Sequence, residues 1–149
     1  MNLKDLCLEY FSSCKLMQLA TVNENNPWIC NVYFVIDESL NIYWTSSKIR
    51  QHSKDILANP NVAVSVVKDP DNKQALQITG NATIVSLDDA SRVDKLYSDK
   101  FGENPGRLTE VMANNPDGRA YWQIIPTSIF FWDEVNFPQA PKQELKLSK

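Results

Sequence analysis

Three short apolar segments, separated by polar turns, stand one after another in the first third of the chain. The joining residues are Asn23-Glu24-Asn25-Asn26 and Asp37-Glu38-Ser39, which are types that tolerate the backbone angles of tight turns. Strands connected so closely pair antiparallel, so this succession predicts an antiparallel meander. The expected strands are Leu16–Val22, Trp28–Ile36 and Leu40–Trp44.

Further strands follow in the rest of the sequence. They are expected at Val62–Val67, Ala75–Val85, Tyr121–Ile125 and Ile129–Trp132, the last two hinged at Pro126. Gly80 inside a strand indicates a bulge, a bend or a close backbone approach. Because strands and helices do not alternate regularly, a parallel doubly wound sheet is disfavoured. The pattern predicts about six or seven antiparallel strands with packed helices, an α+β protein built on a small barrel.

Helical periodicity marks three segments. Asn2 is expected to cap the first, the second ends before Pro60, and Ser86-x-x-Asp89 resembles a capping box that opens the third. Their apolar stripes are Leu3, Leu6, Cys7, Tyr10 and Phe11; Ile49, Ile56 and Leu57; and Ala90, Val93, Tyr97 and Phe101. Residues 102–118 predict a long loop with one short helical turn. We expect one domain over residues 1–137 and an extended or disordered tail over 138–149.

Charge and cysteine content narrow the classes of function. A net charge of −3 argues against a general nucleic-acid binder, although a local basic pocket is compatible with it. The amino-terminal segment lacks a long apolar run, so we expect no signal peptide, no membrane span and a cytoplasmic location. The 3 cysteines lack C-x-x-C spacing and the chain has 1 histidine. A disulfide framework or a metal centre is therefore not expected, and the cysteines are expected as buried thiols.

A phosphate site is predicted where the strand ending in Thr45, Ser46 and Ser47 meets a short basic helix. Helix N-termini leave unpaired N–H donors and carry partial positive charge. Lys48, at the entrance, is the expected cation for a phosphate. His52 lies on the inward stripe, either as a hydrogen-bonded core residue or as a phosphate contact. The other cations, Arg50 and Lys54, are expected as a solvated face.

Two amides and several aromatic residues are candidates to face a flat ring. Asn31 is either a satisfied interior or interface amide or a group facing a heterocycle. Gln77 bonds a ring edge if it points inward and is surface if it points outward. Trp122, Phe131 and Trp132 are core, a subunit interface or a wall against a ring. No motif for a nucleophile–base pair, a carboxylate dyad, a P-loop or a dinucleotide fingerprint is present, so the catalytic residues stay unknown.

Four stretches together resemble the pyridoxamine 5′-phosphate oxidase-like, FMN-binding split-barrel superfamily, nearest to its small general-stress and YhbP-like members. They are ATVNENNPWICNVYFVIDESLNIYWTSS, ILANPNVAVSV, LQITGNATIV and IIPTSIFFWDE. The resemblance implies a six-stranded antiparallel split β-barrel (Greek-key) with flanking helices, working as a homodimer with FMN at each subunit junction. It places Cys30, Asn31 and Val32 along the isoalloxazine ring, and Tyr43, Thr45 and Ser46 beside the ribityl chain and phosphate.

The chain departs from the oxidase of that family in two places. The oxidase's Ser-Arg-Lys phosphate triplet corresponds to Arg50, Gln51 and His52 here, with Lys48 as the compensating cation. The oxidase's carboxyl-terminal substrate segment has no counterpart after Asp133-Glu134. The resemblance therefore implies a flavin site but not pyridoxamine phosphate oxidation.

The sequence thus predicts a cytoplasmic homodimer that binds FMN and acts as a flavin-dependent oxidoreductase on an unidentified small molecule. Ser46, Lys48 and His52 are expected at the phosphate. Asn31 and Gln77 are expected at the ring's polar edge, with Trp122 or Trp132 of the partner as its wall. The alternatives are a non-catalytic flavin binder with a vestigial pocket, a haem-handling protein with His52 as iron ligand, and, least favoured, a barrel that binds single-stranded nucleic acid.

Overall fold

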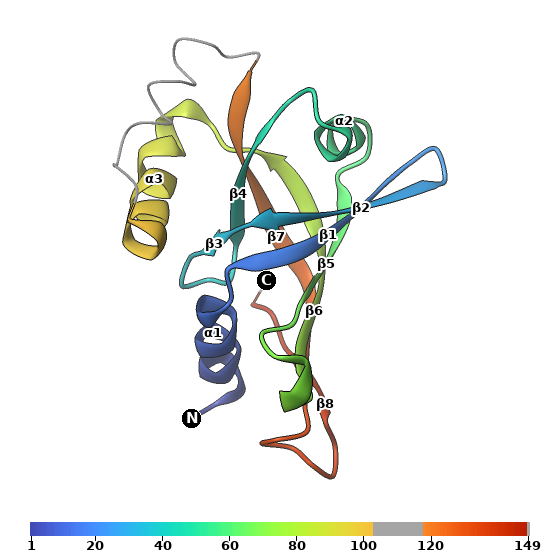
Figure 1. Ribbon diagram of the computed structural model, residues 1–149, viewed down its shortest axis with the longest axis vertical. Coiled ribbons are helices and arrows are strands. Elements are labelled where there is room, and N and C mark those ends of the chain that lie inside the picture. Colours follow the sequence, from blue (N-terminus) through green and yellow to red (C-terminus); the bar gives the residue numbers. More distant parts are fainter. Residues whose placement is uncertain (103–117, 149) are drawn as a thin grey trace.

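The computed structural model describes residues 1–102 and 118–148, and Figure 1 shows its three helices around one curled sheet. The helices are α1 (Leu3–Ser13), α2 (Gln51–Ala58) and α3 (Leu87–Phe101), with a 3-10 turn, η1, at Pro70–Asn72. The strands are β1 (Leu16–Asn23), β2 (Asn26–Tyr33), β3 (Val35–Ile36), β4 (Ile42–Ser47), β5 (Asn61–Val66), β6 (Gln74–Ile84), β7 (Arg119–Asp133) and β8 (Lys142–Leu145). The predicted loop over 102–118 lies, apart from its two end residues, outside the described residues.

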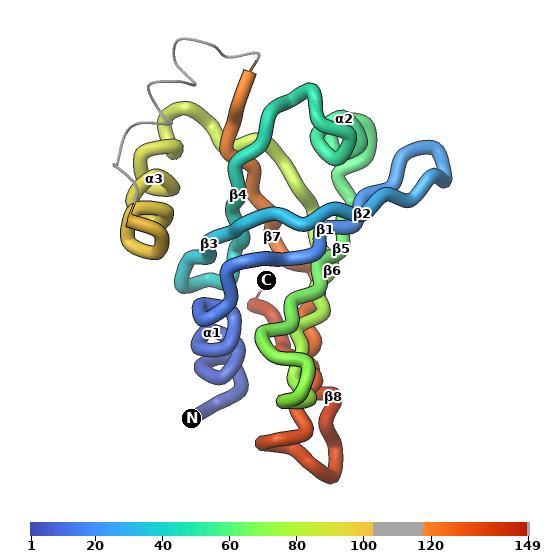
Figure 2. Tube along the Cα trace, viewed as in Figure 1, coloured from blue at the N-terminus to red at the C-terminus, as the bar shows by residue number. Residues whose placement is uncertain are grey.

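The sheet runs in the order β2-β1-β5-β6-β7-β4-β3, and β8 pairs with the outer part of β7. Each of these pairings is antiparallel, as predicted. β2 and β3 lie at opposite ends of this order, yet only Phe34 separates them in the chain. The chain itself therefore brings the two edges together, and the sheet curls into an open half-barrel (Figure 2). This is the α+β split-barrel arrangement.

The count of six strands that the resemblance implied was wrong, because seven strands lie along the sheet, and β8 adds to it. The residue pattern had predicted six or seven. The expected strand Trp28–Ile36 is divided at Phe34, a fully buried residue whose N–H donates to Lys15 O (3.2 Å). Of the two alternatives for the tail, residues 142–145 take the extended one, since they form β8. Backbone pairing with β7 and the contact of Leu145 with the core hold this segment.

The two strands expected on either side of Pro126 are one strand, β7. The register between β6 and β7 shifts at Thr79/Gly80, so Ser128 pairs with Thr79 while Pro126 pairs with Gly80. Thr127 is the extra residue of this bulge, and a bulge is one of the places in a sheet where proline is tolerated. The predicted irregularity at Gly80 is confirmed.

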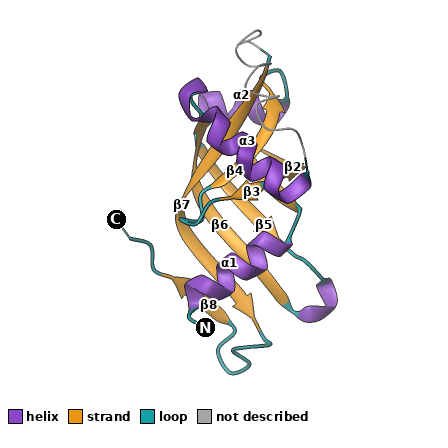
Figure 3. Cartoon of the chain, turned by 90° about the vertical axis from the view of Figure 1, so that its left-hand side faces the viewer, coloured by secondary structure: helices purple, strands orange, loops and turns teal. Residues whose placement is uncertain are grey.

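Helices α1 and α3 lie on one side of the curled sheet (Figure 3). Asn2 caps α1 as predicted, since its Oδ1 accepts from Asp5 N–H (2.8 Å). Phe11 packs on Phe34 with ring centroids 4.8 Å apart, so α1 supports the point where the sheet edges meet. The α3 stripe is confirmed for Ala90, Val93 and Tyr97, which are buried.

Two helix predictions were wrong. Ser86 occupies the N-cap of α3 but makes no side-chain cap bond, and both carboxylate oxygens of Asp89 accept from Arg92 instead. Ile49 and Leu57 are 73% and 61% exposed rather than on the inward face. Helix α2 begins only at Gln51, and its inward face is made of His52, Ser53, Asp55 and Ile56.

The cysteine prediction is confirmed in its main point, since Cys7, Cys14 and Cys30 are unpaired thiols, the first two buried and the third half-buried. In the part of the chain that the structure describes, no helix has the length and apolarity needed to cross a membrane.

Candidate functional site

A groove of about 290 Å³ lies on the outer face of the sheet, across β2, β1, β5, β6 and β7. Every residue that lines it belongs to one of these strands. The alternation along each strand puts small or apolar side chains here, including Ala20, Ala63, Ile29 and Phe130. Ile29 is 64% exposed, so one wall of the groove is an apolar side chain in water. Such a surface suits a flat aromatic ligand or a second protein surface.

Both amides predicted to face the ring lie on this outer face. Gln77 lines the groove opposite Phe130 and Ser65. Asn31 stands on the same face of β2, where its Oδ1 accepts from Gln18 Nε2 (3.0 Å). The interior alternative for Asn31 is therefore wrong, because the side chain is exposed in this chain, and the interface alternative stays a prediction. Amides beside an apolar groove can bond the polar edge of a heterocycle.

The corner between β4 and α2 is occupied by its own side chains. Ser46 Oγ and His52 Nε2 are 2.7 Å apart, and the two residues are only 6% and 8% exposed. Ser46 O also accepts from Trp122 Nε1 (3.1 Å), and Ser53 Oγ donates to Ser47 O (2.8 Å). This Ser–His pair was not foreseen, because residues six apart across a loop have no recognisable spacing.

A buried carboxylate stands in the same corner. Asp55 is 2% exposed, and its two oxygens accept from Thr21 Oγ1 and Gln51 Nε2, each at 2.8 Å. Burial, reinforced by the Arg50 charge, lowers the pKa of His52 below 6.5, while Asp55 acts in the opposite direction. The neutral form of His52 is therefore favoured in this corner, which makes it a poorer partner for a phosphate.

The remaining predicted residues are distributed over other parts of the barrel. Cys30 and Val32 face the interior, paired with Leu19 and Met17 of β1. Tyr43 and Thr45 lie on β4, where Arg92 NH2 donates to Tyr43 OH (3.0 Å) and Arg119 Nε donates to Thr45 Oγ1 (3.0 Å). Lys48 is half-buried, and its backbone N–H donates to Gly118 O (3.1 Å).

The two candidate tryptophans differ in accessibility. Trp122 is fully buried and stacks on Trp44 at 6.2 Å between ring centroids, so it is core. Trp132 is 38% exposed on the outer face of β7, and its Nε1 donates to Glu134 Oε2 (3.1 Å). A single chain thus brings Asn31, Gln77 and Trp132 to one face of the sheet and leaves the β4–α2 residues elsewhere.

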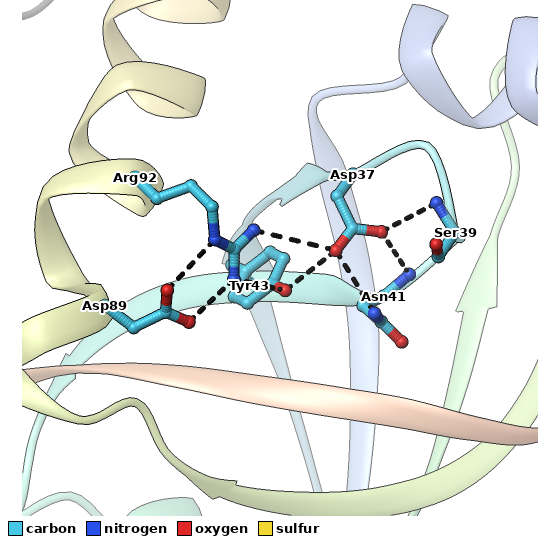
Figure 4. A network of polar contacts seen from close by, with 6 residues as sticks. All are labelled: Asp37, Ser39, Asn41, Tyr43, Asp89 and Arg92. Carbon is cyan, nitrogen blue, oxygen red and sulfur yellow. Dashed lines mark hydrogen bonds and ion pairs between the residues drawn. The ribbon is translucent and has the colours of Figure 1, made fainter.

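A polar network that the sequence analysis missed joins the β3–β4 turn to β4 (Figure 4). Asp37 Oδ1 accepts from Ser39 N–H (2.9 Å) and Asn41 N–H (3.0 Å), and Oδ2 accepts from Tyr43 OH (2.8 Å). These bonds stabilise the positive φ of 67° at Leu40. The turn at Asp37-Glu38-Ser39 was predicted from these residue types, but the bonds of the Asp37 side chain to Asn41 and Tyr43 were not.

Arg92 connects this network to α3 (Figure 4). Its guanidinium is held by Asp89 at 2.7 Å and lies 3.7 Å from Asp37. Asp37 and Arg92 also border a cleft of about 460 Å³ between α1, the β3–β4 turn and α3. Because Arg92, the cation of this cleft, is paired with Asp37 and Asp89, we assign the cleft to the attachment of α3 rather than to ligand binding.

Lys100 near the end of α3 holds the junction of the two sheet edges. Its Nζ donates to Phe34 O (3.0 Å) and to Cys14 O, and lies 4.2 Å from the Phe34 ring centroid. Burial lowers the pKa of Lys100 to about 8.

These features define an α+β split-barrel protein with an apolar groove on its outer face. The family model described as pyridoxamine 5′-phosphate oxidase matches residues 3–133, and the chain therefore belongs to that family, as its resemblance implied. A search of curated proteins gave no match.

Solved structures share this fold. General Stress Protein 26 from Bacillus anthracis is 19% identical, with a TM-score of 0.70 and coverage of 99% of this chain and 100% of that one. HutZ, described as the heme storage protein from Vibrio cholerae, is 21% identical, with a TM-score of 0.68 and coverage of 87% and 94%. A protein from Mesorhizobium loti described as FAD-binding is 14% identical, with a TM-score of 0.65 and coverage of 85% and 89%. The structural neighbours thus include one protein described as FAD-binding and one described as a heme storage protein.

Proposed function

We propose that this protein binds FMN with the isoalloxazine ring in the outer groove, at the seam of a homodimer. The observation that carries the proposal is an apolar groove with amides at its margin. Ala20 and Ala63 leave room for a planar ring, and Gln77 and Asn31 supply donors and acceptors for its polar edge. The family neighbour described as FAD-binding adds support for a flavin ligand.

The second subunit is proposed because one chain does not enclose the ligand. A groove of about 290 Å³ is at the lower end of the range for small-molecule pockets and lies open on the sheet face. The same face exposes Ile29, Leu16 and Trp132 at 64%, 40% and 38%. A partner copy would cover these side chains and supply a wall for the ring. Trp132 is the better candidate for that wall, since Trp122 is buried in its own core.

Bound flavin supplies electron or hydride transfer, and we propose an oxidoreductase acting on a small molecule. The protein's part is to bind and orient the ring. The outer-face side chains exclude water from one side of it, and the amide of Gln77 can hold a hydrogen bond at its edge. We assign no residue as an acid or base.

Haem is the second ligand that family neighbours suggest, and the groove supports it less well. Within the described lining there is no His, Cys, Met or Tyr to serve as an axial ligand. His52, the earlier candidate, has its Nε2 bonded to Ser46 at 2.7 Å. We therefore propose flavin rather than haem.

The test is a titration of the purified protein with FMN, in which binding is monitored by the quenching of flavin fluorescence. The visible spectrum of the freshly purified protein is recorded as well. Ala63→Phe fills the groove, whereas Asn81→Phe places the same ring on the same face of the sheet outside the groove lining. We expect FMN binding to be lost in the first variant and kept in the second, with both folded by circular dichroism. Equal binding by both variants, or a Soret band in fresh protein, would refute the proposal.

A further inference from the structure

The phosphate corner expected from the sequence is closed by hydrogen bonds within the chain. Ser46 Oγ, the hydroxyl best placed for a phosphate, is bonded to His52 Nε2 at 2.7 Å. Both residues are more than nine-tenths buried, so neither group faces a ligand. Ser53 Oγ likewise donates its hydrogen bond to Ser47 O. A phosphate would have to break these buried bonds before it made its own.

The charge of this corner also opposes an anion. Asp55 is 2% exposed, with both oxygens hydrogen-bonded. Two donors that could have served a phosphate, Thr21 Oγ1 and Gln51 Nε2, are used by this carboxylate. A dianionic group placed beside it meets like-charge repulsion in a poorly hydrated site. The donors of the corner are thus already matched to a negative charge that the protein supplies itself.

The groups left to bind a phosphate on the solvent side of α2 are weak anion ligands. The helix N-terminus has no side-chain cap bond, Arg50 and Lys54 are exposed, and Lys48, the cation expected at the entrance, is half-buried. Exposed cations and a helix end contribute little to anion binding, and salt screens them. They account for less than about a tenfold gain in affinity, and this gain falls as ionic strength rises.

From these contacts we infer that the site recognises the flavin ring and not its phosphate, so that riboflavin binds nearly as tightly as FMN. The inference rests on the proposed function, because it assumes that the ring enters the outer groove. It assigns the ligand class as isoalloxazines irrespective of the 5′ substituent. Because Ser46 and His52 bond to each other, this corner offers no contact that would distinguish FMN from riboflavin.

The experiment compares FMN and riboflavin titrations of the full chain at about 0.05 and 0.5 M salt. The dissociation constant of riboflavin divided by that of FMN should be below about ten at low salt and closer to one at high salt. The double variant Arg50→Ala/Lys54→Ala should leave riboflavin affinity unchanged and bring the ratio to about one. Lys4→Ala, which removes an exposed lysine on α1, is the matched control and should change neither.

A preference for FMN above about tenfold at either salt concentration would overturn the inference while leaving the proposed function in place. Loss of that preference in the double variant would place the phosphate at α2, and its persistence would place the phosphate elsewhere. If neither flavin binds, the proposed function itself fails and the inference falls with it.

Discussion

Gly80 is the position where adding one carbon atom tests the β6–β7 bulge most directly. A Cβ built there would lie 2.6 Å from Ile124 Cγ2 and 2.7 Å from Ile125 O. The first contact can be relieved by a side-chain rotation, but the second involves the backbone of β7. The carbonyl must therefore move, and the pairing next to the bulge must move with it.

The expected cost follows from these contacts. Overpacking in a well-packed core costs about 1–3 kcal/mol, so Gly80→Ala should cost about 2 kcal/mol. Gly80→Val adds two further methyl groups at the same place and should cost about 3 kcal/mol or more. For a domain of this length, about 2 kcal/mol corresponds to a melting temperature lowered by about 4–8 °C.

The assay is urea and thermal unfolding followed by circular dichroism. Asn81→Val, at the adjacent exposed position of β6, is the control and should change the free energy of unfolding by less than about 0.5 kcal/mol. A Gly80→Ala variant as stable as the parent chain would refute the argument, because it would mean that the β7 backbone yields without cost.

Three further predictions concern the sheet junction, the turn network and the outer face. Lys100 has a pKa of about 8 when folded against 10.5 as its ordinary value, so the unfolded chain holds this proton more tightly and stability should rise with pH above 8. The gain between pH 7 and 9 should be about 1 kcal/mol and should vanish in Lys100→Met but not in Lys95→Met, as measured by urea unfolding at each pH. Asp37→Ala leaves its turn donors unpaired and should cost about 2 kcal/mol in urea unfolding, whereas a loss below about 0.5 kcal/mol would mean that the network is dispensable. Ile29→Glu should convert the proposed dimer to a monomer in sedimentation velocity while the circular dichroism spectrum stays unchanged, and an intact dimer would move the seam to another surface.

Local patterns in the sequence determined most elements of this fold. Turn residues at Asn23–Asn26 and Asp37–Ser39 set the antiparallel connections, and the apolar stripes of α1 and α3 set their buried faces. Gly80 marked the bulge by its residue type alone. These features were predictable because tight turns and helical periodicity depend on residues close together in the chain.

Tertiary contacts determined which face of the sheet each candidate residue occupies and which partner it bonds, because sequence periodicity does not specify either. Alternation showed that Asn31 shares a face with its neighbours two residues away, but not that this face is the outer one beside the groove. Likewise the hydroxyl of Ser46 was assigned to a phosphate and the ring of His52 to either a phosphate or a hydrogen-bonded place in the core. Only their 2.7 Å contact in the folded chain shows that they satisfy each other. A sequence reveals which groups need a hydrogen-bond partner, whereas the packing of distant segments determines which partner each group finds.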